Sequence, residues 1–249
     1  VGHGPALPAR DPTILPDMPP GRAAVLYQGW EFTVTHPEPV LVHPDGCRDL
    51  IVLRDPEGTC RLLYSDWDRA PRAVQLPPGT RATGFRLAPG LVIAPAALAL
   101  LRRDLDRAAP DLCAQMIEAE AAPDPETREA IAALTRPGAT VEAVARHCGL
   151  GARSLQRRFQ AMGLPRPDFW RQLGRARRAA LALAGASPLA EIACAHGFSD
   201  QAHLSRECLR WFGSPPARLR RDSALLAPLL HPGLGNWTAD GRPEAGELL

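Results

Sequence analysis

The sequence predicts an α+β protein, in which a β-rich N-terminal domain precedes an all-α domain with two helix-turn-helix units joined by a linker helix. Two observations support this fold class. Short apolar runs recur about every 8–12 residues through the first hundred positions, which is typical of a β-barrel or β-sandwich. Two similar helical patterns then begin 48 residues apart, at Thr140 and Pro188. A length of 249 residues is sufficient for two modest domains.

The N-terminal strands are predicted from alternation and from turn residues. In residues 30–34, apolar side chains alternate with polar ones, which is the period of a half-buried strand. Turn-forming sequences at 44–46, 55–58 and 77–79 interrupt the apolar runs that follow. We therefore expect further strands at residues 40–42, 50–53, 62–64, 74–76 and 85–87.

Beyond Pro95 the pattern becomes helical. Leu98, Leu101 and Leu105 follow helical spacing as far as Pro110, which is expected to end that helix. A second short helix is predicted at 111–121. The leucine stripe has two interpretations of equal weight: it packs against its own β domain, or it pairs two chains in a homodimer. The predicted division is residues 1–95 for the β-rich domain, 96–135 for a helical connector and dimerisation segment, 136–222 for the double helix-turn-helix domain, and 223–249 for an irregular C-terminal tail.

The first helical unit covers residues 140–163. Gly149 is expected at the turn, because glycine adopts a left-handed conformation without strain, and Gly151 stands at the expected N-cap of the second helix. On that helix Leu155 and Phe159 form one buried stripe. The side chains that lie off this stripe are expected to face base edges in a major groove: Arg153, Gln156 and Arg157.

The second unit repeats this plan over residues 188–213. Gly197 is expected at the turn and Ser199 at the N-cap, with Leu204 and Cys208 as the buried stripe. A helix predicted at 168–184 would be roughly 25 Å long. A rigid helix of that length could hold the two units near the separation of about 34 Å between successive major grooves on one face of DNA. The second set of groove-facing residues is expected to be Gln201, Ala202, His203 and Arg206.

Basic charge is concentrated in the duplicated region. Residues 136–222 hold 15 Arg and 6 acidic residues, a net charge of +9, whereas residues 1–135 carry −5 and residues 223–249 carry −2. Such a block is the electrostatic footprint of a protein that binds phosphates. Because paired helices of this kind enter the major groove, the pattern predicts double-stranded DNA as the partner.

Other classes of protein are less well supported by the sequence. The six cysteines form no CxxC pair, no apolar stretch is long enough to span a membrane, and the N-terminus lacks the apolar core of a signal peptide. We therefore expect a cytoplasmic protein with reduced thiols and no membrane association. His36, His43 and Cys47 lie close in sequence, but their spacing matches no usual metal site. No catalytic triad or phosphate-binding loop stands out, so no metal, cofactor or enzymatic activity is predicted.

The segment GFSDQAHLSRECLRWFGSPPARLR, residues 197–220, resembles the signature of AraC-type (AraC/XylS) helix-turn-helix transcriptional regulators. SLQRRF at 154–159 and RARRAALAL at 175–183 are similar to the first recognition helix and the linker helix of that family. The resemblance covers about residues 136–221. It implies that Arg153, Gln156 and Arg157 read one groove, and that Gln201, Ala202 and Arg206 read the next. Two positions depart from the family pattern: Cys208 replaces a usual Phe, and Leu219 replaces a usual Tyr. Both are core positions, so these departures bear on packing rather than on function.

The N-terminal half carries a second resemblance. HPDGCRDLIVL at 43–53 and GFRLAPG at 84–90 look like motifs of a β-rich, cupin-like sensory domain found ahead of some AraC-type DNA-binding domains. That resemblance implies a domain that binds a small-molecule effector or mediates dimerisation. Arg48, Asp49 and Arg86 are candidates for meeting an anionic effector; they are equally compatible with structural ion pairs or with solvated side chains. Residues 44–46 are interpreted as a hairpin turn rather than as a ligand contact.

Three hypotheses follow for the function. The leading one is a sequence-specific transcription regulator, in which each protomer reads two adjacent major grooves and a signal at the N-terminal domain modulates binding. One alternative is a cupin-type metal-dependent enzyme with a regulatory helical domain. The other is a non-specific architectural DNA binder, whose phosphate contacts would carry no sequence information.

Overall fold

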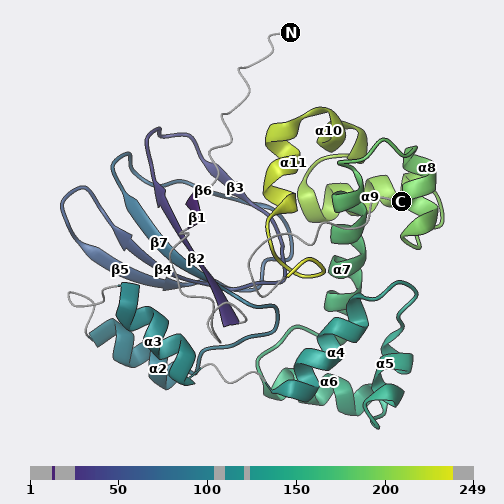
Figure 1. Cartoon of the computed structure of the whole chain (residues 1–249), viewed down its shortest axis with the longest axis horizontal. Helices are drawn as coiled ribbons and strands as arrows, with labels where there is room; N and C mark the ends of the chain where they lie inside the picture. The colour runs from purple at the N-terminus through teal and green to yellow at the C-terminus, as the bar shows by residue number, and fades with distance from the viewer. Residues whose placement is uncertain (1–12, 15–25, 104–109, 121–123, 238–249) are drawn as a thin grey trace.

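The computed structural model of the chain describes residues 13–14, 26–103, 110–120 and 124–237. Strands occupy the N-terminal part and helices the remainder, so the predicted α+β class is confirmed (Figure 1). Among the described residues the strands are β1 (Thr13–Ile14), β2 (Tyr27–Thr33), β3 (Val40–Val42), β4 (Asp49–Arg54), β5 (Cys60–Tyr64), β6 (Arg72–Val74) and β7 (Arg81–Leu87).

These strands form two antiparallel sheets. The larger has the order β1-β2-β7-β4-β5, and β3 pairs with β6 in the smaller. The described strands thus form open sheets and do not close into one barrel. Strand β6 ends at Val74, so the strand predicted at 74–76 lies too late in the sequence. The reason lies in the partner strand: Val74 pairs with Val40, so the next pair would set Gln75 against Pro39, which has no backbone donor.

The centre of the larger sheet contains one very close approach. Gly84 on β7 lies opposite Trp30 on β2 and Ile51 on β4. A Cβ atom at position 84 would lie 2.1 Å from the Trp30 ring, so glycine lets the indole lie over β7. The indole Nε1–H donates to Asp49 Oδ1 at 3.0 Å, which links β2 to the start of β4.

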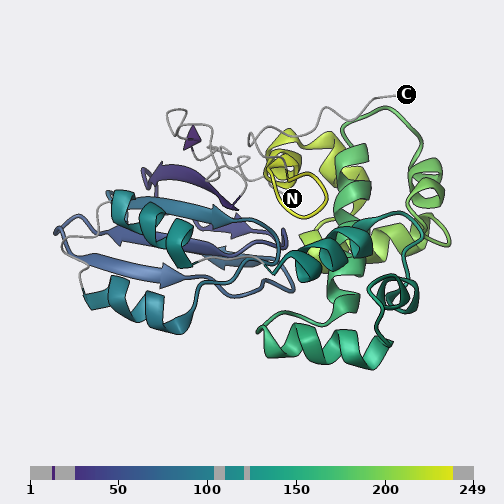
Figure 2. The same cartoon turned by 60° about the horizontal axis from the view of Figure 1, so that its bottom comes forward.

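Helices α2 (Pro95–Arg103) and α3 (Pro110–Glu120) lie against the five-stranded sheet (Figure 2). Leu98 and Leu101 of α2 are buried in a core with Leu50, Phe85 and side chains of α3. The described part of the leucine stripe therefore packs against its own domain, and Leu105 lies outside the described residues. Helix α3 begins at Pro110, one residue before the predicted start at 111. Proline is common at the first position of a helix, because its missing N–H would have no partner within the helix there.

The helical domain is built around a long central helix, α7 (Pro167–Ala182), in place of the linker predicted at 168–184. Trp170, Leu173 and Ala180 of α7 are fully buried in a core shared by both helical units. No helix in the described ranges is long and apolar enough to cross a membrane. The helices around α7 are α4 (Pro125–Thr135), α5 (Val141–His147), α6 (Ala152–Ala161), α8 (Leu189–Ala195), α9 (Gln201–Phe212) and α10 (Pro216–Arg221).

The prediction of an irregular tail from residue 223 is wrong for its first part, which forms helix α11 (Ser223–Leu230). Asp222 caps this helix by accepting a hydrogen bond from the Ala224 amide at 3.1 Å. Leu226 and Leu229 are buried against the helical core, and this burial outweighs the hydrogen bond that Pro228 cannot donate. Residues 238–249 lie outside the described part of the chain.

The β-rich part packs directly on the helical domain. The Trp67 ring meets Trp170 of α7 edge to face at a centroid distance of 5.2 Å, and its Nε1–H donates to the Gly163 carbonyl at 3.3 Å. His43, in the loop between β3 and β4, lies against Phe212 at the end of α9. Trp67, which follows β5, thus contacts the linker helix and the end of the first helical unit, whereas His43, which follows β3, contacts the second unit.

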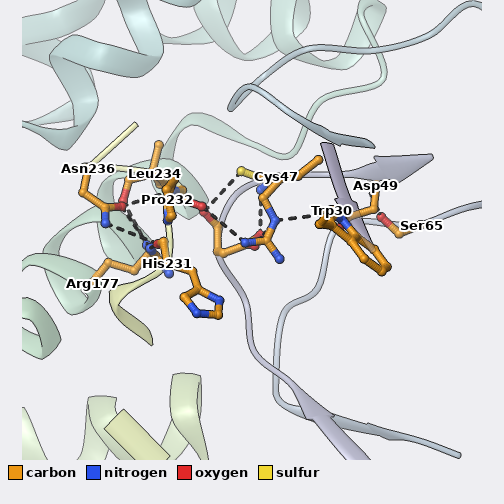
Figure 3. A network of polar contacts seen from close by, with 12 residues as sticks. Trp30, Cys47, Asp49, Ser65, Arg177, His231, Pro232, Leu234 and Asn236 are labelled. Atoms are coloured by element: carbon orange, nitrogen blue, oxygen red, sulfur yellow. Dashed lines mark hydrogen bonds and ion pairs between the residues drawn. The ribbon is translucent and has the colours of Figure 1, made fainter. Parts of the chain in front are cut away.

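Residues 231–236, which we call the C-terminal clamp, join α7 to the β-rich part (Figure 3). Arg177 of α7 is 1% exposed. Its guanidinium donates to the carbonyl oxygens of Leu234 and His231 at 3.0 and 2.8 Å, and to Asn236 Oδ1 at 3.1 Å. On the other side, the Leu234 amide donates to the Asp45 carbonyl at 2.7 Å. The clamp is therefore held by the linker helix and by the loop that precedes β4.

Candidate nucleic-acid interface

Helix α6 is the second helix of the first unit. The turn before it contains Gly149 at φ +67°, as predicted, and the helix is preceded by Gly151, an N-cap without a side-chain hydrogen bond. Leu155 and Phe159 are fully buried, which confirms the predicted stripe. Because this stripe faces the core, the side chains one or two positions away from it point outward.

The predicted reading residues of α6 lie on that outward side. Arg153 and Arg157 are exposed and Gln156 is half-buried, and no hydrogen bond or ion pair to their side chains occurs within the described ranges. Their neighbour Arg158 differs, because it pairs with Asp124 at 2.8 Å and with Glu126. Arg158 therefore anchors α6 to the start of α4, while the other three side chains remain available.

Helix α9 occupies the same position in the second unit. Gly197 has φ +74°, as predicted for the turn, and Leu204 and Cys208 are fully buried. The N-cap is Asp200 rather than the predicted Ser199: the Asp200 carboxylate accepts a hydrogen bond from the His203 amide at 2.6 Å. This backbone hydrogen bond lowers the pKa of Asp200, so an ionised group caps the positive end of the helix.

The outward residues of α9 differ in how far they are fixed. Gln201, Ala202 and Arg206 are exposed, and no hydrogen bond or ion pair of the Gln201 amide or the Arg206 guanidinium is found within the described part of the chain; the charge of Arg206 contributes to the lowered pKa of Asp200. His203 is half-buried, and its ring contacts Ser199. Helix α9 thus combines two exposed polar side chains with one imidazole that is held in place.

Helix α7 separates the two recognition elements. In Figure 1, α6 lies beside the lower end of α7 and α9 beside its upper half. Arg175 of α7 donates to the Gly197 carbonyl at 3.1 Å and stacks over the Phe198 ring at 4.5 Å. Gln172 of α7 accepts from Arg210 of α9 at 2.8 Å. These contacts fix the turn and the outer face of the second unit to the linker helix.

The structure places the three effector candidates in internal contacts. Arg86 pairs with Asp45 at 3.4 Å and with Asp49 at 3.6 Å, and it donates to the Pro232 carbonyl of the clamp at 3.4 Å (Figure 3). Burial lowers the pKa of Arg86, but the two carboxylates outweigh it and raise the pKa overall. For Arg86 and Asp49 this geometry favours the interpretation as structural ion pairs. Arg48 instead donates to the Ser65 carbonyl at 2.6 Å and stacks over the Tyr64 ring at 3.6 Å.

The loop before β4 is not a simple hairpin turn. Gly46 has φ +76° and Asp45 Oδ1 accepts from the Cys47 amide at 2.8 Å, which are turn features, but β3 and β4 belong to different sheets. A Cβ atom at Gly46 would lie 2.7 Å from Leu234 Cβ, so the loop is shaped to receive the clamp. No group of three His, Cys, Asp or Glu side chains in the described ranges is arranged to hold a metal ion.

Two groups of residues were missed by sequence reasoning. One is Arg158, Arg175 and Arg210, which position recognition elements yet look like DNA-binding arginines in the sequence. The other is the pair Arg177 and Asn236, which connect α7 to the clamp. Asn236 is the only asparagine in the sequence, but a single polar residue in a tail gives no signal that distinguishes a buried contact from a solvated one.

Comparison with known proteins finds matches to the region that contains α6 and α9. A family model described as a helix-turn-helix domain matches residues 144–222. The HTH-type transcriptional regulator VirS of Mycobacterium tuberculosis, in two strains, is 40% identical to this chain over 84 residues. That match covers 32% of this chain and 24% of VirS, so the chain spans about a quarter of the length of these curated relatives.

Solved structures with a similar arrangement include two bacterial proteins. The C-terminal domain of AraT, a response regulator from Geobacillus stearothermophilus, is 25% identical with a TM-score of 0.35, over 39% of this chain and 85% of that one. ToxT from Vibrio cholerae is 8% identical with a TM-score of 0.41, over 79% of this chain and 98% of that one. Both TM-scores are below 0.5, so we infer nothing about this chain from these two structures.

Proposed function

We propose that this chain, which carries a helix-turn-helix domain of the AraC type at residues 144–222, is a sequence-specific transcription regulator whose protomer reads two adjacent major grooves. The main support is the contrast between paired and unpaired side chains on α6 and α9. On each helix, polar side chains that flank a buried stripe have no protein partner within the described ranges. Such groups are available to hydrogen-bond base edges.

The chemistry of these groups suits direct readout. Arg153, Arg157 and Arg206 each present a planar guanidinium, which binds guanine O6 and N7 in a bidentate manner. Gln156 and Gln201 each carry the amide that pairs with adenine N6 and N7. The net charge of +9 over residues 136–222 supplies the attraction to phosphates that positions such contacts.

We further infer that the β-rich part modulates DNA binding through its contacts with α7. Trp67 packs on Trp170 of that helix, and the clamp connects Arg177 to Asp45. A signal that shifts the β-rich part would therefore act on the helix between the two recognition elements. The test is Trp67→Ala. This variant should change the affinity of the chain for the selected DNA site at least threefold, while the base sequence of the selected site stays the same. Unchanged affinity would argue against transmission through this junction.

Selection of bound duplexes from a random DNA library tests the main proposal, with the full chain at near-physiological salt. The expected product is a motif of two short blocks about one helical turn apart. Arg206→Ala should weaken the preference within one block, at a cost of about 1–3 kcal/mol. The matched control is Arg102→Ala, which removes an exposed arginine of α2 outside the helical units and should leave the motif unchanged.

Other results of this selection would point elsewhere. Retention of DNA without any motif, together with steep salt dependence, would indicate the architectural binder, because phosphate contacts carry no sequence information. Equal base preferences in Arg206→Ala and the unmodified chain would contradict the assignment of Arg206 to a base edge. A repeat of the whole motif would indicate that two protomers bind side by side.

A further inference from the structure

His203 lies in the first turn of α9, where its imidazole is fixed from within the protein. The Ser199 backbone N–H donates to His203 Nδ1 at 3.3 Å, and the Ser199 hydroxyl lies 3.2 Å from the same nitrogen. The backbone of His203 is fixed as well, because its amide donates to the Asp200 carboxylate. Both the ring and its attachment to the helix are therefore constrained.

The contact with Ser199 determines which ring nitrogen carries the proton. A backbone N–H can only donate a hydrogen bond, so Nδ1 must accept and cannot carry hydrogen. A ring turned by 180° would place a carbon against that N–H and lose the bond. The neutral imidazole of His203 therefore carries its single N–H at Nε2.

Packing keeps the imidazole in this orientation. Its ring meets Phe198 edge to face, with centroids 5.3 Å apart and an interplanar angle of 88°. Phe198 is itself buried and covered by the Arg175 guanidinium at 4.5 Å. A side chain held in this way loses little conformational freedom when it binds, which favours specificity. The Nε2 position has no partner among the described residues.

We propose that His203 presents a fixed Nε2–H donor to the major groove and discriminates against cytosine, because guanine (N7 and O6), adenine (N7) and thymine (O4) each offer an acceptor there. Cytosine offers only its amino donor there, so the two N–H groups would oppose one another. His203 thus distinguishes a G·C pair from a C·G pair in the block read by α9. Ser199 acts as a positioning residue through its backbone amide. This inference rests on the proposed function, because it requires that α9 enter a major groove.

The tautomer is testable without DNA, by long-range ¹⁵N–¹H correlation of His203 in the full chain. We expect Nδ1 to show the signature of an unprotonated ring nitrogen and Nε2 that of a protonated one. Ser199→Ala keeps the backbone N–H and should leave this pattern unchanged. A protonated Nδ1 in the neutral ring would overturn the inference, as would a tautomer that changes in Ser199→Ala.

Duplex selection tests the base preference. The unmodified chain should exclude cytosine at one position of the α9 block. His203→Ala should lose that preference, with binding to the selected site roughly three- to tenfold weaker. His203→Gln should additionally accept cytosine, because the amide oxygen accepts a hydrogen bond from the cytosine amino group. His147→Gln, an exposed histidine on α5 that contacts Glu129, is the control and should leave the motif unchanged.

The possible failures can be distinguished. If no motif emerges, the proposed function fails together with the base preference, whereas the tautomer measurement still reports on the free protein. If a motif emerges and His203→Ala alters no position, only the assignment of His203 is wrong. A cytosine at the altered position would likewise overturn the acceptor rule while leaving the proposed function in place.

Discussion

Replacing Arg177 with Met is expected to release the C-terminal clamp from the linker helix. The guanidinium is buried and donates to Leu234, His231 and Asn236, and no ion pair with a carboxylate accompanies these bonds in the described residues. A methionine side chain fills an irregular space well but donates no hydrogen bond. The substitution therefore removes one donor from each of three oxygens. Asn236 Oδ1 keeps the Gly233 amide as a donor, and the His231 carbonyl keeps the Asn236 side chain.

Two opposing effects set the magnitude. A hydrogen bond from a charged donor contributes about 1.5–3 kcal/mol, so three of them sum to about 5–9 kcal/mol. Burial lowers the pKa of Arg177, a sign that the charged form is penalised there, and a buried ion without a partner costs several kcal/mol. Methionine removes that penalty as well as the bonds. We expect a net loss of about 3 kcal/mol, or about 100-fold in the equilibrium for opening the clamp.

Hydrogen exchange of the full chain measures this opening locally. The Leu234 amide, which donates to the Asp45 carbonyl, should exchange about 100-fold faster in Arg177→Met, with the amides of β7 unchanged. Arg102→Met, at an exposed position near the end of α2, is the matched control and should alter neither. Acceleration of less than threefold at Leu234 would refute the conclusion that Arg177 holds the clamp.

Three further changes have defined outcomes. Gly84→Ala places a Cβ atom 2.1 Å from the Trp30 ring and should destabilise the chain by about 2 kcal/mol or more in urea unfolding; an unchanged midpoint would contradict this packing. Thr140→Ala removes the cap on the Ala143 amide and should cost about 1 kcal/mol, again read from the urea midpoint. Burial lowers the pKa of His43 to about 4 from 6.5, so the unfolded chain binds more protons between these values and stability should fall by up to about 3 kcal/mol as pH decreases from 6.5 to 4. His43→Gln should abolish that part of the pH dependence, and a pH profile identical to that of the unmodified chain would show that His43 is not its source.

Local features were predictable because their causes are local. The buried stripe of α6 follows from the spacing of Leu155 and Phe159, and the turns before α6 and α9 follow from glycines that adopt positive φ. The N-cap of α9 was misplaced by one residue. Ser199 and Asp200 are both good caps, and only the backbone geometry decides which of them precedes the first helical residue.

The clamp was not predictable for the opposite reason. Residues 231–236 are rich in Pro and Gly, which indicates irregular backbone, and irregular backbone is usually solvated. Here its carbonyl groups are satisfied by Arg177, more than fifty residues away in sequence. Likewise, nothing in the sequence indicates that Arg86 is paired, but in the folded structure it forms ion pairs with Asp45 and Asp49. Contacts between distant segments leave no periodicity in the sequence, so pattern analysis cannot find them.

Contacts between distant segments also limit how many arginines of the helical domain are free to contact DNA phosphates. Residues 136–222 contain 15 arginines, yet Arg158 pairs with two acidic groups of α4, and Arg177 is enclosed by the clamp. Each such arginine is removed from the set that contacts phosphate. Because the salt dependence of binding scales at about 0.9 per phosphate contact, the observed slope should fall well below the value for fifteen contacts. Under the proposed function, readout then depends on Arg153, Arg157 and Arg206, whose side chains form no hydrogen bond or ion pair within the described ranges, and this property cannot be obtained by counting charges.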